Sequence, residues 1–523
     1  MWWQNGVVYQ IYPSSFQDSN GDGLGDLVGV MQRLDYLAEL GVDAIWFSPI
    51  FPSPMADFGY DVADYVDIHP QFGSLAVFDD LLAAAHARNI KIILDLVPNH
   101  TSVEHPWFKE ARSSRDNPKR DWYIWKDPAP DGGLPNNWMA YFGGPAWTFD
   151  ETTGQYYMHN FDPGQPELNW RNPEVEQAMH DVMRFWLRRG VDGFRIDVIG
   201  HIIKDADFRD NPVTADGQIQ RIYSEQQPEV HQYIHRIRRV FDEFPNTVSI
   251  GEVPYEFSPL NQESYYGTEE TPELHLPFNF GLIPLSWNAE LIRSAADAYD
   301  ASIPSHGWPN NVLGNHDSPR IASKYGPAQA RVATMLLLTL RGTPTLYYGD
   351  EIGMTNVTIP KERILDPQGR NTDKFNRDEC RTPMQWNAGL HAGFSDNPDT
   401  ELWLPLAGDY ETVNVTVQEN DPQSTLALNK ALLALRRAEP ALHLGTYQSL
   451  QGADGCFVYM RQHADSQFVI ALNFTSETKT LHLRDLAGTV AVSTLMDRQG
   501  DAVNLSALEL RPDEGVIVRL GGG

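Results

Sequence analysis

The strongest constraint on the fold is an alternation of short apolar strands with amphipathic helical runs. In the first hundred residues, β-rich segments lie at 7–12, 44–47 and 91–96, and apolar residues at helical spacing fill 30–40 and 75–88. Strands that alternate with helices in this way predict right-handed βαβ units and a parallel sheet.

The alternation resumes after Pro173 and continues to residue 437. Further strands are expected at 193–197, 247–253, 274–278, 311–314 and 344–347, and helices at 175–188, 222–244, 289–299, 328–340 and 425–437. Eight strands in this order predict an α/β fold of the (β/α)8 TIM-barrel type, with a doubly wound open sheet as the alternative.

Two segments interrupt this pattern. Residues 101–170 are rich in Trp, Asn, Pro and Gly, which indicates a lid or a small subdomain inserted after the third strand. After residue 445 the apolar period becomes two, as in a small antiparallel β-sandwich. The expected domains are a barrel at 1–100 and 171–445 with a long excursion after strand eight at about 354–400, an inserted domain B at 101–170, and a C-terminal β domain at 446–523.

The charge balance excludes several classes of partner. Forty basic and 70 acidic side chains give a net charge of −30, which repels nucleic acid and anionic membranes. Two cysteines fit a reducing compartment, and neither a signal peptide nor an apolar stretch long enough to span a membrane is found, so we expect a cytoplasmic location. No phosphate-binding loop or dinucleotide fingerprint predicts an organic cofactor.

Polar residues follow the expected strands where a barrel carries its active site. Asp95 and His100 lie at or after the end of strand three, and Arg195 and Asp197 close strand four. Strand five ends at Glu252, and His316 and Asp317 follow strand seven. A single Asp at a strand end is usually a loop cap, but four such positions predict a site at the C-terminal rim of the barrel.

Two carboxylates on neighbouring strands favour glycoside hydrolysis over other chemistries. No serine nucleophile elbow is found, and the short His-x-x-x-His spacing of a zinc site is absent. Arg195 is expected to keep Asp197 ionised as a nucleophile, whereas Glu252 needs a raised pKa to donate a proton.

Four segments then show a family resemblance. They are 95–100 (Asp-Leu-Val-Pro-Asn-His), 193–198 (Gly-Phe-Arg-Ile-Asp-Val), 251–253 (Gly-Glu-Val) and 313–317 (Leu-Gly-Asn-His-Asp). In order and spacing they resemble the signature regions of the α-amylase family, glycoside hydrolase family 13. The segment 165–169 (Gln-Pro-Glu-Leu-Asn) resembles a region typical of its oligo-1,6-glucosidase and α-glucosidase subfamily, and 342–354 resembles its strand-eight motif.

The resemblance implies a role for each matching residue. Asp197 matches the nucleophile, Glu252 the general acid/base, and Asp317 the third carboxylate, which holds sugar hydroxyls. Residues that match substrate-holding positions are Arg195, His100, His316 and, as a platform under the bound glucose, Tyr60. Asp57 and Arg381 resemble a pair that closes the pocket at the non-reducing end, and Phe142 and Phe161 resemble aromatics that line it, although simple packing would also explain these two.

An acidic loop follows the first strand. Residues 18–26 place oxygen ligands at positions 1, 3, 5 and 9 of an EF-hand-like pattern, but Gly29 stands where the bidentate Glu belongs. A solvated acidic turn is one interpretation. The resemblance favours a structural Ca²⁺, or alternatively Mg²⁺, with the ligands Asp18, Asn20, Asp22, Asp26 and the Leu24 carbonyl.

The resemblance implies a retaining exo-α-glucosidase that acts on small α-glucosides such as maltose, isomaltose, short oligosaccharides or sucrose through a covalent β-glucosyl enzyme. Alternatives are an oligo-1,6-glucosidase, which Val198 after the nucleophile weakly favours, or a glucosyl-transferring or isomerising relative such as a trehalose synthase or sucrose isomerase. A non-catalytic carbohydrate-binding relative is the alternative from another class. All three carboxylates are present, which argues against it.

Overall fold

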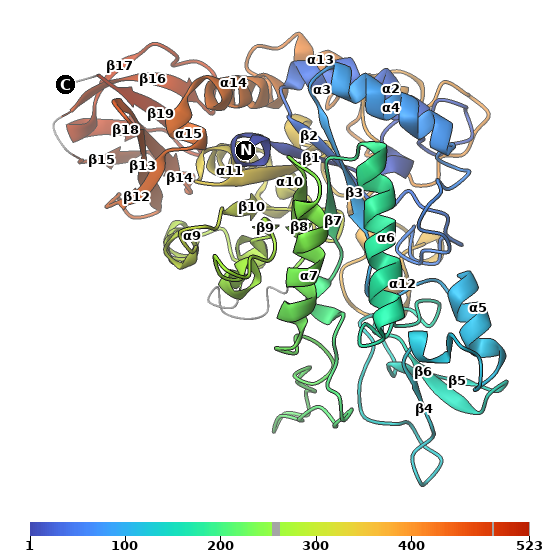
Figure 1. The fold of residues 1–523 in the computed structure, drawn as a ribbon. Helices are drawn as coiled ribbons and strands as arrows, with labels where there is room; N and C mark the ends of the chain where they lie inside the picture. The colour runs from blue at the N-terminus through green and yellow to red at the C-terminus, as the bar shows by residue number, and fades with distance from the viewer. Residues whose placement is uncertain (254–261, 484–485, 522–523) are drawn as a thin grey trace.

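The computed structural model describes residues 1–253, 262–483 and 486–521, and its centre is a barrel of parallel strands (Figure 1). The sheet order is β10-β11-β1-β2-β3-β7-β8-β9. Strand bounds are Val8–Ile11 (β1), Ala44–Phe47 (β2), Lys91–Leu96 (β3), Gly193–Ile196 (β7), Val248–Gly251 (β8), Leu276–Pro277 (β9), Asn310–Val312 (β10) and Thr343–Tyr347 (β11). Because Asn279 pairs with Asn311 just beyond β9, the sheet closes on itself. The (β/α)8 prediction is therefore confirmed, and the doubly wound alternative is wrong.

Helices surround the barrel close to the predicted positions. They are α2 (Leu27–Gln32), α3 (Leu34–Leu40), α4 (Leu75–Ala87), α6 (Pro173–Arg189), α7 (Val230–Asp242), α9 (Ala289–Ser302), α11 (Pro327–Thr339) and α14 (Thr425–Ala438). The run 30–40 is two helices that meet at Arg33. The run 222–244 becomes helical only at Val230, because Pro228 disfavours helical backbone in the residue before it.

The insertion after β3 forms a small layer of its own. It contains α5 (Pro106–Ser113) and a three-stranded antiparallel sheet of β4 (Trp125–Lys126), β6 (Gln155–Met158) and β5 (Trp147–Asp150). Phe108 of α5 stacks on Trp125 of β4 with 5.6 Å between the ring centres. Aromatic packing of this kind stabilises a segment that has few regular hydrogen bonds.

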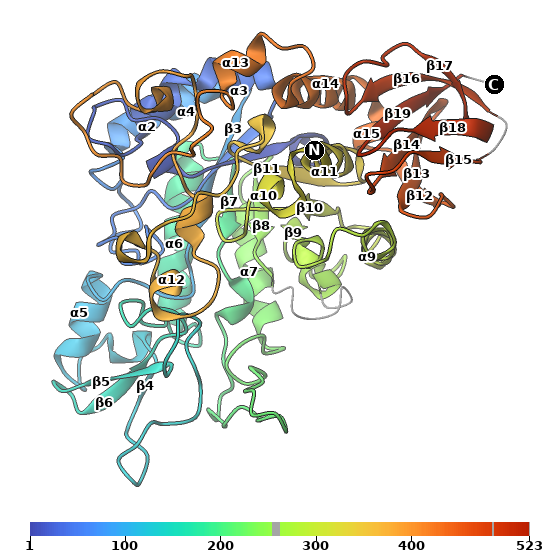
Figure 2. The same cartoon turned by 180° about the vertical axis from the view of Figure 1, so that it is seen from behind.

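The C-terminal part is antiparallel, as predicted. A six-stranded sheet runs β12-β13-β14-β19-β16-β17, and β15 pairs with β18. The bounds are Thr446–Leu450 (β12), Cys456–His463 (β13), Ser466–Asn473 (β14), Lys479–Leu481 (β15), Ala487–Ser493 (β16), Ala502–Asn504 (β17), Leu508–Leu510 (β18) and Gly515–Leu520 (β19). Both views place these sheets beside α11 and α14, at the opposite end of the molecule from β4–β6 (Figures 1 and 2).

The excursion after β11 reaches the insertion across the C-terminal rim. It carries the short helix α12 (Pro367–Asn371), which lies near α6 in both views (Figures 1 and 2). Lys374 Nζ donates to the main-chain oxygen of Tyr141 at 3.1 Å. The insertion and the excursion together therefore cover the rim where the strands end.

Among the described residues, no helix has both the length and the apolar character that a membrane crossing requires.

Candidate active site

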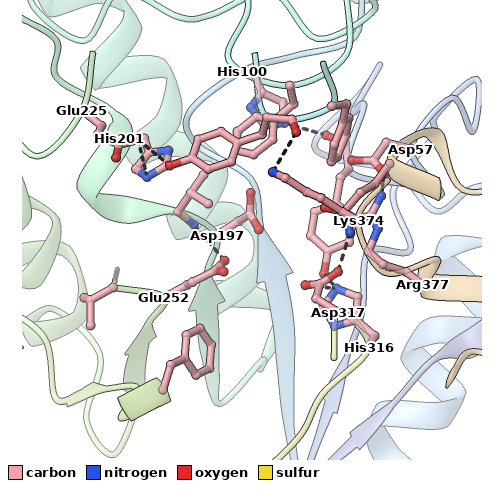
Figure 3. Close-up of a pocket in the computed structure, with 18 of the residues that line it drawn as sticks. Asp57, His100, Asp197, His201, Glu225, Glu252, His316, Asp317, Lys374 and Arg377 are labelled. Carbon is pink, nitrogen blue, oxygen red and sulfur yellow. Dashed lines mark hydrogen bonds and ion pairs between the residues drawn. The ribbon is translucent and has the colours of Figure 1, made fainter. Parts of the chain in front are cut away.

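A cavity of about 430 Å³ opens at the C-terminal rim of the barrel (Figure 3). Nine residues from the sequence-based site prediction line it: Asp57, Tyr60, His100, Phe142, Phe161, Asp197, Glu252, His316 and Asp317. Arg195 and Arg381 do not line it. Both are buried behind its wall, where their guanidinium groups hold the lining carboxylates.

The register of neighbouring strands brings the reacting groups together. Asp95, Arg195 and Ile250 are paired across β3, β7 and β8, and the ladder continues from Asp197 N to Leu96 O at 2.8 Å. Val198 follows in a left-handed conformation, with φ at 34°. A β-branched residue is strained there, and such strain concentrates at functional sites. This turn lets the Val198 N–H donate to Glu252 Oε2 at 3.2 Å.

Arg195 joins three carboxylates. Its NH1 lies 2.8 Å from Asp95 Oδ1 and 2.8 Å from Asp197 Oδ1, and its NH2 contacts Glu252 Oε2. One buried cation cannot balance three carboxylates. Burial raises the pKa of Asp95 to about 6 against the opposing effect of Arg195.

The same centre corrects one expectation. Burial raises the pKa of Asp197 well above its ordinary value; Arg195 opposes this rise, and the Glu252 and Asp95 carboxylates add to it. The predicted effect of Arg195 on Asp197 has the expected direction, because Arg195 lowers this pKa, but burial acts against it and has the larger effect.

Asp317 has the opposite environment. Its Oδ1 accepts from Arg381 NH2 at 2.9 Å and from Arg377 NH1 at 3.1 Å, and its Oδ2 lies 3.1 Å from His316 Nε2. Although burial opposes ionisation, the contact with His316 and the charges of Arg377 and Arg381 lower the pKa of Asp317 well below its usual range. Asp317 is therefore a fixed anion in the cavity wall.

The expected Asp57–Arg381 pair is wrong. Asp57 Oδ1 accepts from Arg377 NH2 at 2.7 Å, and Asp366 holds the same guanidinium from behind at 2.7 Å. Arg381 donates instead to the main-chain oxygen of His316 at 2.9 Å. The two arginines lie about one turn apart around the helical turn Arg377–Cys380, so their side chains leave in different directions.

Tyr60 and His316 form a stacked pair, with ring centres 5.4 Å apart and planes 2° from parallel. Gln10 Nε2 lies 2.7 Å from His316 Nδ1, and the Tyr60 hydroxyl lies 2.7 Å from His316 Nε2 and donates to Asp95 Oδ2 at 3.0 Å. Burial lowers the pKa of His316 and lowers that of His100 to about 3, so both rings are neutral. Neutral imidazoles suit hydrogen bonds with sugar hydroxyls.

The insertion supplies aromatic walls. The Arg377 guanidinium lies 4.9 Å from the centre of the Phe142 ring, and Phe161 lies 5.3 Å from the ring of His100. The two phenyl rings are 5.7 Å apart. Both line the cavity, so they pack against one another and also face the space that a ligand would fill.

Sequence reasoning missed the remaining cavity residues: Tyr141, Val198 as a lining residue, His201, Glu225, Gln226, Val253, Phe280, Gln368, Lys374, Phe375 and Arg377. Figure 3 places His201 and Glu225 on the other side of Asp197 and Glu252 from Asp57 and Arg377. The cavity therefore has two halves, with the reacting carboxylates between them. Arg377 could have been considered from the sequence, because it lies only four residues before the predicted Arg381. No local sequence pattern indicates Glu225.

The loop after β1 holds its shape through its own hydrogen bonds. Asp18 accepts from the N–H groups of Asn20, Gly21 and Gly23 at 2.7–3.1 Å, and Asn20 Nδ2 donates to Asp22 Oδ2 at 3.1 Å. Among the described residues, no three His, Cys, Asp or Glu side chains gather as metal ligands. The predicted ligands also include Asn20 and the Leu24 carbonyl, and oxygen donors of this kind suit a hard cation, so the Ca²⁺ or Mg²⁺ stays a prediction.

Comparisons with known proteins agree with this geometry. Residues 10–445 match the model of the α-amylase catalytic domain. A "Probable alpha-glucosidase" of Rhizobium meliloti is 40% identical, with 95% of each chain covered, and an "Oligo-1,6-glucosidase" of Parageobacillus thermoglucosidasius is 37% identical, with 99% of each covered. The crystal structure of the alpha-glucosyl transfer enzyme XgtA superposes with a TM-score of 0.93 at 40% identity, covering 99% of both chains. The chain belongs to the α-amylase family of glycoside hydrolases.

Proposed function

We propose that this protein is a retaining, exo-acting α-glucosidase with Asp197 as the nucleophile, Glu252 as the general acid/base and Asp317 as the residue that holds sugar hydroxyls. The observation that carries the proposal is the Arg195 centre, where one guanidinium contacts both Asp197 and Glu252 in the cavity wall. A single guanidinium that contacts both carboxyl groups holds them close together. Retaining enzymes need this short spacing, whereas inverting enzymes need a wider gap that leaves room for a water.

In the first step, Asp197 Oδ attacks the anomeric carbon while the bond to the leaving-group oxygen breaks. Glu252 gives its proton to that oxygen. In the second step a water attacks the glucosyl ester, Glu252 takes the water proton, and Asp197 leaves as the carboxylate. Two inversions release α-glucose.

The exo mode rests on the half of the cavity around Asp57 and Arg377, which we call the glucose half; the opposite half, around His201 and Glu225, is called the leaving-group half. Arg377 bridges Asp57, Asp317 and Asp366, and this network stands where a second sugar would have to pass. Asp57, Asp317 and the neutral His100 present hydrogen-bonding groups towards a terminal glucose. A site built to hold hydroxyl groups penalises substrates that cannot satisfy it. We propose maltose, isomaltose, short oligosaccharides and sucrose as substrates.

Glucosyl transfer is the second candidate. It is favoured by the 40% identity to a protein named as an alpha-glucosyl transfer enzyme. The same covalent intermediate serves both outcomes, and the acceptor that reaches it decides between them.

Three further proposals come from the sequence. The chain divides into a barrel at 1–100 and 171–445, a domain B at 101–170 and a C-terminal domain at 446–523. The loop Asp18–Asp26 takes a divalent cation as a stabiliser remote from the chemistry. The cytoplasmic location is supported by Cys380 and Cys456, which are both free and buried.

Time-resolved proton NMR of 4-nitrophenyl α-glucoside hydrolysis, in which all the glucose formed comes from the glucosyl group, tests the function. The first glucose signal is expected from the α-anomer, and β-glucose as the first product would contradict a retaining mechanism on an α-glucoside. Side-by-side rates on maltose, isomaltose, sucrose and trehalose then identify the preferred linkage.

A further inference from the structure

The leaving-group half of the cavity carries one carboxylate that differs from all the others. Asp57, Asp197, Glu252 and Asp317 each contact an arginine. Glu225 also lines the cavity and is only 2% exposed, yet within 4.0 Å it has no Lys or Arg nitrogen of the described residues. A buried carboxylate without a cation is costly, so its presence calls for a functional reason.

The neighbours of Glu225 put no cation in contact with it. Burial raises the pKa of its carboxyl, and the hydrogen bond from Tyr141 and the more distant charge of Arg221 lower it. Tyr141 OH donates to Oε2 at 2.6 Å, and His201 Nε2 lies 3.4 Å from the same oxygen. His201 is 5% exposed, and burial lowers its pKa to about 3, so the ring is neutral. Its Nδ1 has no hydrogen-bond partner among the described residues.

The cations nearby are engaged with other groups. Lys204 pairs with Glu167 and donates to Asn99 Oδ1 at 2.9 Å. Arg221 donates to the main-chain oxygen of Met139 at 2.6 Å and packs on the Tyr141 ring. Lys374 Nζ donates to the main-chain oxygen of Tyr141. The leaving-group half therefore presents the Glu225 carboxylate with no Lys or Arg of the described residues in contact with it.

We propose that Glu225 determines leaving-group specificity: it accepts hydrogen bonds from neutral, hydroxyl-bearing leaving groups and acceptors and repels anionic ones such as carboxylated or phosphorylated aglycones. This rests on the proposed function, because it takes Asp197 and Glu252 as the point of cleavage. A like charge brought into a desolvated site is disfavoured strongly enough to set specificity.

Three donors that share the same glucose separate this role from catalysis. α-Glucosyl fluoride places only fluoride in the leaving-group half, 4-nitrophenyl α-glucoside places a neutral ring there, and 4-carboxyphenyl α-glucoside places an anion there. The measured quantity is the ratio of kcat/KM for the neutral to the anionic aryl glucoside. Intrinsic leaving-group reactivity cancels when this ratio is compared between wild type and a variant.

Glu225→Gln keeps the shape and removes the charge. Its ratio is expected to fall about tenfold below wild type, while kcat/KM for α-glucosyl fluoride stays within about twofold. Asp207→Asn, which removes one exposed carboxylate outside the cavity, should retain the wild-type ratio.

An unchanged ratio in Glu225→Gln overturns the proposal. A wild-type preference for the anionic donor also overturns it. Loss of α-glucosyl fluoride turnover in Glu225→Gln would show that Glu225 supports the reacting groups instead. If wild type turns over none of the three donors, the proposed function fails, which is a distinct result.

Discussion

The two arginine centres of the active site differ in charge balance. Arg195 alone faces Asp95, Asp197 and Glu252, whereas Arg377 and Arg381 together face Asp57, Asp317 and Asp366. In the first centre burial raises the pKa values of Asp95 and Asp197. In the second the arginines lower those of Asp317 and Asp366 against the effect of burial, and only Asp57 is raised, to about 6, by burial.

The difference in charge balance suits the two centres to different roles. A centre with too few cations binds a proton readily, which acid/base chemistry requires. A centre with two cations keeps Asp317 ionised, and a fixed anion with rigid partners can hold sugar hydroxyls in one orientation. The rim of the barrel therefore carries one centre suited to proton exchange, around Arg195, and one that stays charged, around Arg377 and Arg381.

The largest expected effect comes from the first centre. Asp197→Asn removes the nucleophile, because a neutral amide does not attack the anomeric carbon. We expect kcat to fall by about five decades, which corresponds to about 7 kcal/mol, with the fold intact by circular dichroism. A variant that keeps more than about a tenth of the wild-type kcat would assign the nucleophile to another residue.

A change in the second centre should weaken binding of the terminal glucose of the substrate. Arg377→Ala leaves Asp57 and Asp366 without their partner, and we expect kcat/KM on maltose to fall by about 2 kcal/mol or more, roughly 30-fold. Arg363→Ala removes an exposed arginine of the same excursion and should have no effect.

Soluble starch should be a poor substrate of wild type. Rapid loss of starch viscosity would contradict a closed glucose half.

The acid limb of the pH profile sharpens the comparison. Asp95 is one of the charges that raise the pKa of Asp197, so Asp95→Asn should lower that pKa. Because ionised Asp197 is the reactive form, the acid limb of kcat/KM should move to lower pH by about one unit. An upward shift would mean that the hydrogen bonds of Asp95, and not its charge, control the centre.

The smallest effect is expected outside both centres. If the loop Asp18–Asp26 binds a divalent cation, chelation removes a ligand that stabilises only the folded state. We expect the melting temperature to fall by about 1 °C for each kcal/mol of lost stability, and the initial rates at room temperature to stay unchanged. Unchanged melting in excess chelator, with no metal in the purified protein, would support the acidic-turn interpretation.

The barrel was predictable because its signals are local. A buried strand needs a short apolar run, a covering helix needs apolar residues at helical spacing, and eight repeats of this unit close a barrel. The placement of Asp197 and Glu252 followed from the same logic, since the ends of parallel strands meet at one rim. The errors at Arg33 and at Val230 are errors of helix boundary, where local signals are weakest.

The sequence by itself therefore determined the barrel, its rim and the three carboxylates at the strand ends, because each depends on residue type and spacing along the chain. Tertiary structure decided which arginine meets Asp57, how many carboxylates share Arg195, and that Glu225 enters the cavity without a cation. These are contacts between loops that are far apart in the sequence. Their charge balance depends on burial and direction, and neither is encoded in the spacing of any one segment.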